Sequence, residues 1–481
     1  MSAWVPSQLV RLPRRLLAGP GDPPSSAQAR ATERHRRVAL SAMMTMLSIG
    51  LKLLGSILSI PLALNYLGAE RFGLWMTLIS LMALINFSDL GVGNGLINAI
   101  AATHGRNDSA AVRAHVSTAF FLLLGFALAV YAILCTVGAF LPWASVFNLS
   151  SPVAVAEAGP AVAVLNGCIA GHLVLGVATK IRIGYQEDYR NSMWDGLGVV
   201  ISLGAIILFI EMDLGMPWLV FAACGVPTLL TGGNLASLLL VERRWLLPAW
   251  RHCRRASVRE LFRYGLLFFT LHMMATITVS SDNLIAIRLC GPEAAGMLAV
   301  ALKLFSPCRL LAGAVLQPLW PAYGEAISRG DIAWVRQTLI RSIALLQLAV
   351  LPMAVALVFL GNWLAPLWLR QPVHFGDALL IGLAVWVIVE AVGFAVAMFL
   401  NGASIIGVQI AMATSCAALA IAAKLLLGRE FGIAGIVWGT IIAYSATTIA
   451  PYGVLVPYRI AALARQRRPG AAALPAALGG E

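Results

Sequence analysis

Long apolar runs recur from residue 38 to residue 458 of this chain, and only short polar breaks separate them. Each run has about 20 to 30 residues, which as a helix is enough to cross a hydrocarbon layer about 30 Å thick. Strands of a membrane barrel are excluded, because they alternate apolar and polar residues over about 10 positions. The sequence therefore predicts an all-α, polytopic membrane protein.

The composition agrees with a membrane environment. Apolar residues make up 60% of the chain and charged residues 11%, whereas soluble domains have about 45–50% and about 25%. A net charge of +13 would indicate nucleic acid in a soluble protein. Here the cations gather in the loops, so we expect contact with membrane lipids and no nucleic-acid partner.

Twelve membrane-spanning helices are predicted, which places both termini on one side. The loops on that side contain most of the Lys and Arg residues, and this asymmetry indicates that both termini are cytoplasmic. The cations in the opposite loops are Arg71, Arg288, Arg370 and Arg429. The predicted spans are 38–64, 70–99, 111–140, 159–181, 192–211, 217–241, 261–288, 294–322, 333–360, 378–400, 404–427 and 432–458.

An internal repeat divides the chain into two halves. Residues 68–73 and 291–296 share the pattern Gly-x-Glu-x-x-Gly, and each follows the first span of its half. Two halves of this kind bind substrate between them and give alternating access by rocking. The predicted organisation is a disordered basic tail at 1–37, a six-helix bundle at 38–241, a basic cytoplasmic linker at 242–260, a second six-helix bundle at 261–458 and a cytoplasmic tail at 459–481.

Cations inside the predicted spans are the strongest functional signal. A charge at mid-bilayer costs about 2.5–3.5 kcal/mol, so it should face protein or a water-filled cavity. We predict that Lys52, Lys303 and Arg309 line such a cavity and bind an anionic ligand. The alternative is that each pairs with an acid on a neighbouring helix. Polar residues that share their helix faces, and are expected to line the same cavity, are Ser48, Ser56, Ser306 and Gln317.

Acids inside the spans are candidates for ion coupling. Asp89 lies in a glycine-rich segment, and Glu390 lies mid-span among apolar residues. Both are predicted coupling residues, with a structural ion pair to Lys52 or Arg309 as the alternative for Glu390. Asp282 is expected to be a solvated or packing residue.

Two further kinds of polar residue are expected to have ordinary structural roles. Lys424 lies near the end of its span, where its side chain can extend to the membrane surface. The isolated His172 and His272 are expected to be hydrogen-bonded interior histidines.

Several classes of function lack the sequence features they need. The seven cysteines form no Cys-x-x-Cys pair, and no His, Cys, Asp and Glu set has metal-ligand spacing, so we expect no disulfide framework, metal or cofactor. No Walker lysine loop is present. The longest outer loops, near 141–158 and 361–377, carry few candidate catalytic groups, so we do not expect an enzyme.

Residues 60–101 resemble the first two helices of the polysaccharide-transporter branch of the multidrug/oligosaccharidyl-lipid/polysaccharide exporter (MOP) superfamily, which includes the O-antigen flippases. The matching segments are residues 60–68 (IPLALNYLG), 72–75 (FGLW) and 88–95 (SDLGVGNG). Residues 281–283 (SDN) and 291–293 (GPE) look like the start of the second half in that family.

The resemblance implies a MATE-like fold of two six-helix bundles in a bacterial inner membrane. It also implies a flippase that moves a polyprenyl-pyrophosphate-linked oligosaccharide or polysaccharide repeat unit from the cytoplasmic to the outer leaflet, for surface polysaccharide biosynthesis. The implied partners are this lipid-linked substrate, membrane lipids, and a polysaccharide polymerase with its chain-length machinery. The alternatives are a cation-coupled multidrug or small-molecule antiporter of the same fold, and a membrane polysaccharide polymerase or ligase.

Overall fold

The computed structural model describes residues 27–82, 89–147, 149–369 and 373–465. Within these ranges the regular elements are helices and no strand occurs, which confirms the predicted all-α class. Ten of the helices are long and apolar enough to cross a membrane. The protein is therefore a multi-pass membrane protein.

These ten candidates are compatible with the twelve predicted spans. The candidate at Gly407–Arg465 has 59 residues, which is about 90 Å of helix and enough to cross the hydrocarbon layer twice. The predicted span 70–99 contains residues 83–88, which lie outside the described ranges.

Helices of the first half run from α2 to the end of α11 and a short π-helical turn. Their bounds are α2 Ala27–Leu81, α4 Val92–Gly105, α5 Ser109–Phe140, α6 Trp143–Val146, α7 Pro152–Leu175, α8 Val177–Gly184, α9 Asp188–Glu211, α10 Met216–Val220, a π-helical turn Phe221–Gly225, α11 Val226–Ala236 and a second π-helical turn Ser237–Glu242.

Two 3₁₀ turns connect the halves, and the second half then runs from α12 to α17. The bounds are the 3₁₀ turns Arg244–Leu246 and Trp250–His252, then α12 Arg255–Leu316, α13 Leu319–Arg329, α14 Ile332–Leu369, α15 Asp377–Gly402, α16 Gly407–Tyr444, a π-helical turn Ser445–Ile449 and α17 Ala450–Arg465.

Glycine breaks inside α2 and α12 occupy matching positions of the predicted repeat. Gly68 has φ 70° and ψ 171° within α2, and Gly291 has φ 87° and ψ 169° within α12. A residue with a Cβ rarely adopts such a positive φ, so glycine is favoured at the position where each helix breaks. Both are the first glycine of the shared Gly-x-Glu-x-x-Gly pattern, so the two halves repeat backbone conformation as well as sequence.

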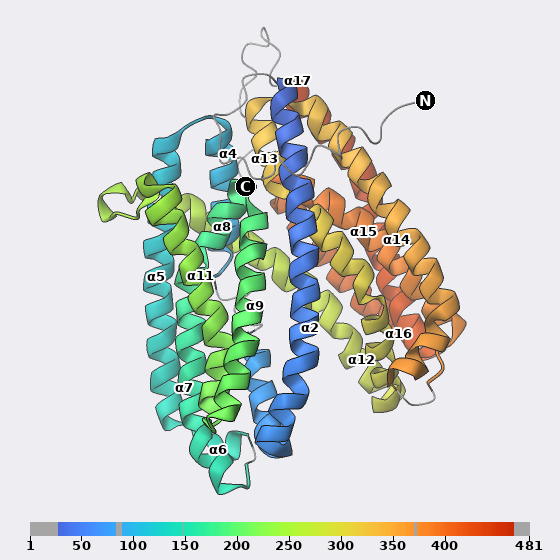
Figure 1. Cartoon of the computed structure of the whole chain (residues 1–481). Coiled ribbons are helices and arrows are strands. Elements are labelled where there is room, and N and C mark those ends of the chain that lie inside the picture. The colour runs from blue at the N-terminus through green and yellow to red at the C-terminus, as the bar shows by residue number, and fades with distance from the viewer. Residues whose placement is uncertain (1–26, 83–88, 148, 370–372, 466–481) are drawn as a thin grey trace, which may run out of the picture.

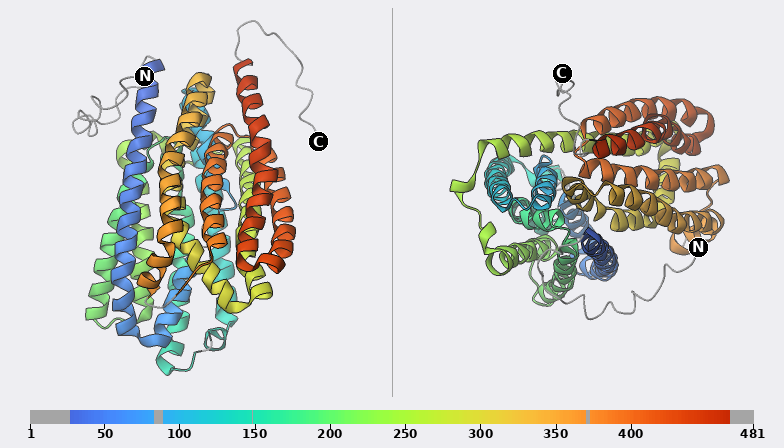
Figure 2. Two further views of the ribbon diagram at one scale, coloured as in Figure 1. Left: turned by 90° about the vertical axis from the view of Figure 1, so that its right-hand side faces the viewer. Right: turned by 90° about the horizontal axis from the view of Figure 1, so that it is seen from above.

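The two halves lie side by side and lean apart toward one end (Figure 1). Helices α2, α4 and α13 come together at the end where α2 begins, and α7 and α16 are separated at the opposite end. Figure 2 shows that α2 begins and α17 ends at the same end of the molecule. We call this the closed end, because side chains of the two halves bond to each other there.

Each half has its own apolar core. The main core of the second half includes Leu298, Phe305, Leu383 and Phe399, and a small separate cluster lies on α16. The first half has two separate cores, one of them near the closed end and also containing Leu261 of α12. The start of α12 therefore packs on the first half, whereas its later turns pack on α16 and α15.

Helix α2 begins at Ala27, so residues 27–37 are helical although the sequence predicted a disordered tail. Ion pairs explain the ordering, because Glu33 binds Arg36 and Arg37 within the helix at 2.8 Å, and Arg34 binds the second half. The rest of the predicted tail, residues 1–26, lies outside the described ranges.

Candidate functional site

Lys52 forms an ion pair with Asp195 of α9. The Lys52 Nζ lies 2.7 Å from Asp195 Oδ2, and the two side chains are 53% and 50% exposed. On α2 the exposed residues from Lys52 to Leu58 cover an arc of roughly 240°, and Gly55 faces Val199 of α9. At this depth α2 therefore packs mainly on α9 and leaves Lys52 accessible.

Arg309 of α12 forms an ion pair with Glu390 of α15, at 3.1 Å between Nη2 and Oε1. This is the structural pairing that the sequence left open for Glu390. The Arg309 side chain is 46% exposed although it is paired. The second carboxylate oxygen, Glu390 Oε2, is buried and has no hydrogen-bond partner in the part of the chain that the structure describes.

Lys303 differs from the other two cations. Its side chain is exposed, and within the described residues no carboxylate lies in ion-pair distance. Ser306 Oγ donates to the Lys303 carbonyl oxygen at 2.7 Å, so this hydrogen bond does not involve the ammonium group of Lys303. Gln317, directly after the last residue of α12, is also exposed.

The polar residues predicted on α2 divide into two kinds. Ser48 is buried, and its Oγ has no hydrogen-bond partner within the described ranges. Ser56 is exposed and donates to the Lys52 carbonyl oxygen at 2.9 Å. Ser56 therefore lies beside the exposed Lys52, whereas Ser48 faces packed protein.

Asp89 precedes α4 and lies near Lys180 of α8. The distance between Lys180 Nζ and Asp89 Oδ2 is 3.8 Å, and Asp89 Oδ1 accepts from the Gly91 amide at 2.9 Å. Asp89 thus caps a turn in which Gly91 adopts φ 75°. Ion coupling at Asp89 stays a prediction.

The expectation for Lys424 was wrong. Its side chain is fully buried, and Nζ lies 2.6 Å from Asp282 Oδ1, 2.6 Å from the Thr278 carbonyl oxygen and 3.0 Å from Ser281 Oγ. Asp282, whose side chain is 14% exposed, is accordingly the largely buried partner of a lysine. Three oxygen partners satisfy the ammonium group, so it does not extend to the membrane surface.

A buried polar latch joins the two halves at the closed end. Arg34 of α2 is 3% exposed, and it binds Glu325 of α13 at 3.3 Å and Asp331 at 2.6 Å. Gln186 Nε2, from the turn between α8 and α9, also donates to Glu325 at 2.6 Å. Arg329 holds the other oxygen of Glu325 at 2.7 Å. We call Arg34, Gln186, Glu325 and Asp331 the latch.

A second set of contacts between the halves surrounds Asn98 of α4. The Asn98 amide donates to the Asn401 carbonyl oxygen at 3.0 Å, and its oxygen accepts from Trp320 Nε1 at 2.7 Å. Gly324 allows the close approach here, because a Cβ on it would lie 3.1 Å from Ala101 Cβ. These contacts and the latch keep the halves together.

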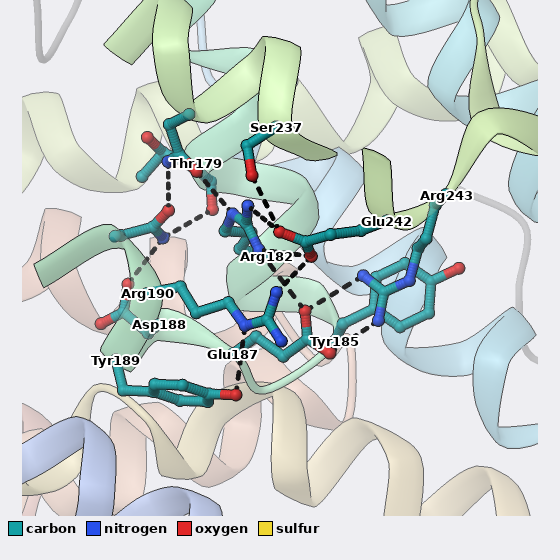
Figure 3. A network of polar contacts seen from close by, with 12 residues as sticks. Thr179, Arg182, Tyr185, Glu187, Asp188, Tyr189, Arg190, Ser237, Glu242 and Arg243 are labelled. Carbon is teal, nitrogen blue, oxygen red and sulfur yellow. Dashed lines mark hydrogen bonds and ion pairs between the residues drawn. The ribbon is translucent and has the colours of Figure 1, made fainter. Parts of the chain in front are cut away.

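The latch continues into a charged network within the first half (Figure 3). Arg182 is fully buried and binds Glu242 with both terminal nitrogens, at 2.9 and 3.0 Å. Arg243 binds Glu187 at 2.6 Å and lies over the Tyr185 ring, 4.0 Å from its centroid. The turn at residues 184–187 is thereby held in place, and that turn presents Gln186 to the latch.

Sequence reasoning missed Asp195, the latch and this network. Asp195 lies inside the predicted span 192–211, one turn from its start, so the same argument that selected Lys52 would have selected it. Residues 182–190 (RIGYQEDYR) form a dense charged cluster in a short loop, which is the available signal for the network. Arg34 fell in the predicted tail and gave no signal.

A family model described as polysaccharide biosynthesis protein matches residues 65–372, which is more than half of the 481 residues. The chain belongs to the polysaccharide biosynthesis protein family. No curated protein matches it in sequence.

Solved structures of MOP superfamily transporters share the fold of this polysaccharide biosynthesis protein. A MATE structure in the bent conformation has a TM-score of 0.77 at 16% identity, covering 90% of this chain and 97% of that one. An outward-facing multidrug resistance MATE transporter of the MOP superfamily has a TM-score of 0.73 at 16% identity over the same shares. A MOP superfamily transporter from Pyrococcus furiosus, whose binding pocket of reverse polarity suggests a different function, has a TM-score of 0.72 at 16% identity, over 89% and 96% of the chains.

Family and fold together confirm the predicted polysaccharide-transporter branch of the MOP superfamily and the MATE-like architecture.

Proposed function

We propose that this polysaccharide biosynthesis protein is a flippase for an oligosaccharide or polysaccharide repeat unit linked to a polyprenyl pyrophosphate. The observation that carries the proposal is Lys303, a mid-span lysine whose side chain is exposed and has no carboxylate partner among the described residues. An unpaired cation at this depth is costly, so an anionic ligand is the natural partner. Lys303 shares α12 with Arg309.

The two paired cations also suit a pyrophosphate. Lys52 and Arg309 remain about half exposed in their ion pairs, so ligand oxygens can reach them. Charge-assisted hydrogen bonds from Lys and Arg to phosphate are strong and, for Arg, bidentate. Phosphate oxygens would then replace Asp195 and Glu390 as the partners of these cations.

This exchange of partners supplies a reason for ion coupling. A carboxylate that loses its cation within the membrane is left uncompensated, which is strongly unfavourable. Glu390 would then take up a proton or another cation while substrate is bound. Glu390 would therefore alternate between two states of one cycle: paired with Arg309 without substrate, and bound to a proton or another cation when substrate is present.

The latch supports alternating access. It is a polar, reversible contact between two halves that each have an apolar core, and the start of α12 joins the core of the first half. The Lys and Arg distribution supports a cytoplasmic position for the closed end, and with this orientation the structure would be a state closed toward the cytoplasm. Separation of Arg34 from Glu325 would admit substrate from the cytoplasmic leaflet, and re-formation would follow its release to the outer leaflet.

A multidrug antiporter is the second candidate, and the exposed Asp195 favours it, because an organic cation could pair with this carboxylate. An anionic substrate is favoured instead, because the set has three cations and two acids. Its members are Lys52, Lys303, Arg309, Asp195 and Glu390.

The test is transport by the full-length protein in proteoliposomes, with leaflet accessibility measured for a panel of lipids. We expect movement of polyprenyl-pyrophosphate-linked sugars and none of a neutral glycolipid of the same chain length. Transport of organic cations without transport of the pyrophosphate-linked sugar would favour the antiporter and overturn the flippase.

A further inference from the structure

A strongly basic hollow lies on the first half, between the start of α5 and the connecting segment 243–254. It has a volume of about 570 Å³ and is lined by Arg113 of α5 and by Trp245, Arg251, His252 and Arg254 of the connecting segment. None of the described residues that line it is acidic. Arg113 Nε is buried and has no hydrogen-bond partner within the described ranges, so this guanidinium has donor capacity to spare.

The connecting segment is fixed against α5, so the hollow is a built feature. The Ala249 amide donates to Ser117 Oγ and the Arg254 amide to Thr118 Oγ1, each at 3.4 Å. The Trp250 ring packs edge-on against Phe121, with 5.0 Å between centroids. These contacts hold Arg251 and Arg254 opposite Arg113.

An amphipathic face of α12 begins where the hollow ends. Arg255, Val258, Arg259, Phe262 and Arg263 line an adjoining hollow of about 450 Å³, and their spacing of three or four residues places them on one helix face. The apolar members and Leu266 are 41–53% exposed. The nearby Glu260 lies off this face and is 3.9 Å from His115.

The combination of features matches one class of ligand. Clustered arginines at the end of a membrane helix bind the phosphates of anionic lipids, and exposed tryptophans are typical of the membrane interface. Trp245 and Trp250 are 39% and 74% exposed. Phosphate would lie among Arg113, Arg251 and Arg254, and an acyl chain would lie along Val258, Phe262 and Leu266.

We propose that this surface is a binding site for an anionic glycerophospholipid, separate from the transport site. Figure 1 shows the connecting segment projecting from the α5 side of the first half, on the side away from the second half. The substrate of the proposed flippase would pass between the halves, so a membrane phospholipid is the ligand that this position favours.

The experiment measures retention of phosphatidylglycerol by the purified full-length protein, using native mass spectrometry against a phosphatidylcholine background. The triple variant Arg113→Gln/Arg251→Gln/Arg254→Gln should bind phosphatidylglycerol about 100-fold more weakly, which is roughly fivefold for each arginine. The matched control Arg106→Gln/Arg336→Gln/Arg465→Gln removes the same charge from other exposed positions and should bind as the wild type does.

The outcomes decide the proposal in both directions. A loss confined to the triple variant supports it, provided that both variants melt cooperatively. Equal loss in the two variants means nonspecific charge attraction and overturns it, as does unchanged binding in the triple variant. Displacement of the lipid by equimolar inorganic phosphate, or by a polyprenyl pyrophosphate, would assign the hollow to another ligand and overturn it.

Discussion

Lys424 and Asp282 form an ion pair, 2.6 Å between Nζ and Oδ1, buried between α16 and α12 of the second half. Lys424 is fully buried and also donates to Thr278 and Ser281. The packing of α12 on α16 is the most extensive between any two helices described, so this pair lies in the main contact of the second half.

Removal of one partner of this pair should destabilise the protein strongly. Lys424→Met leaves Asp282 as an uncompensated buried charge, which costs about 3–5 kcal/mol. We expect a large fall in the thermal unfolding temperature in detergent. The double variant Lys424→Met/Asp282→Leu removes both charges and should recover most of the loss, and an equally unstable double variant would show that the charges are not the cause.

Loss of the latch should open the closed end. Arg34→Gln removes the ion pairs to Glu325 and Asp331, so the closed state loses about 3–5 kcal/mol of interaction. Amide hydrogen exchange in α4 and α13 should rise by about tenfold or more. Arg71→Gln is the control, because it breaks a pair with Glu157 inside the first half at 2.7 Å. Equal exchange in both variants would contradict a latch.

Gly91 should tolerate no side chain. It has φ 75°, and a Cβ would lie 2.2 Å from the Gly265 carbonyl oxygen of α12. In Gly91→Ala the new methyl group would therefore clash with the backbone of α12. The left-handed backbone conformation would itself cost about 1–2 kcal/mol for alanine. We expect a clear drop in unfolding temperature.

Gly125 is the matched control for that substitution. It lies inside α5, and no atom comes within 4 Å of the place that a Cβ would take, so Gly125→Ala should stabilise by up to about 1 kcal/mol. A stable Gly91→Ala variant would mean that α4 and α12 are further apart.

The helical content and the division into two halves could be predicted from the sequence, because both depend on local features of the chain. Continuous apolar runs require helices in a membrane, and the glycines at 68 and 291 mark breaks because glycine readily adopts a positive φ. Both features act within a few residues of chain, so pattern alone was sufficient.

Pairing of charges did not follow from the sequence, because it depends on which helices pack together. Lys52 meets Asp195 and Lys424 meets Asp282 across 143 and 142 positions of sequence. Spacing along one helix shows which residues lie on the same face as a cation. It does not show which residues of a neighbouring helix lie opposite that face. Arg34 and Glu325 are further apart still and belong to different halves.

Binding of anionic lipid to the basic hollow should strengthen as pH falls. Desolvation and the charges of Arg113, Arg251 and Arg254 lower the pKa of His252 below its usual 6.5. A bound phosphate opposes those charges and raises the pKa of His252, so binding takes up a proton and is stronger at lower pH.

The measurement compares phosphatidylglycerol affinity at about pH 5.5 and pH 7.5. His252→Gln should remove most of the difference while retaining binding at the higher pH. Unchanged pH dependence in this variant would assign the proton to another group, such as His115.

Transport by Lys303 variants tests whether this exposed lysine binds the pyrophosphate of the substrate. The assay follows exposure of a polyprenyl-pyrophosphate-linked sugar in the opposite leaflet of proteoliposomes containing wild type, Lys303→Arg or Lys303→Met. We expect Lys303→Arg to keep most of the transport rate. We expect Lys303→Met to insert and fold normally but to lose at least about tenfold in rate, since one charge-assisted hydrogen bond contributes about 1.5–3 kcal/mol. A Lys303→Met protein that flips the lipid at the wild-type rate would contradict the proposed binding of the pyrophosphate by Lys303.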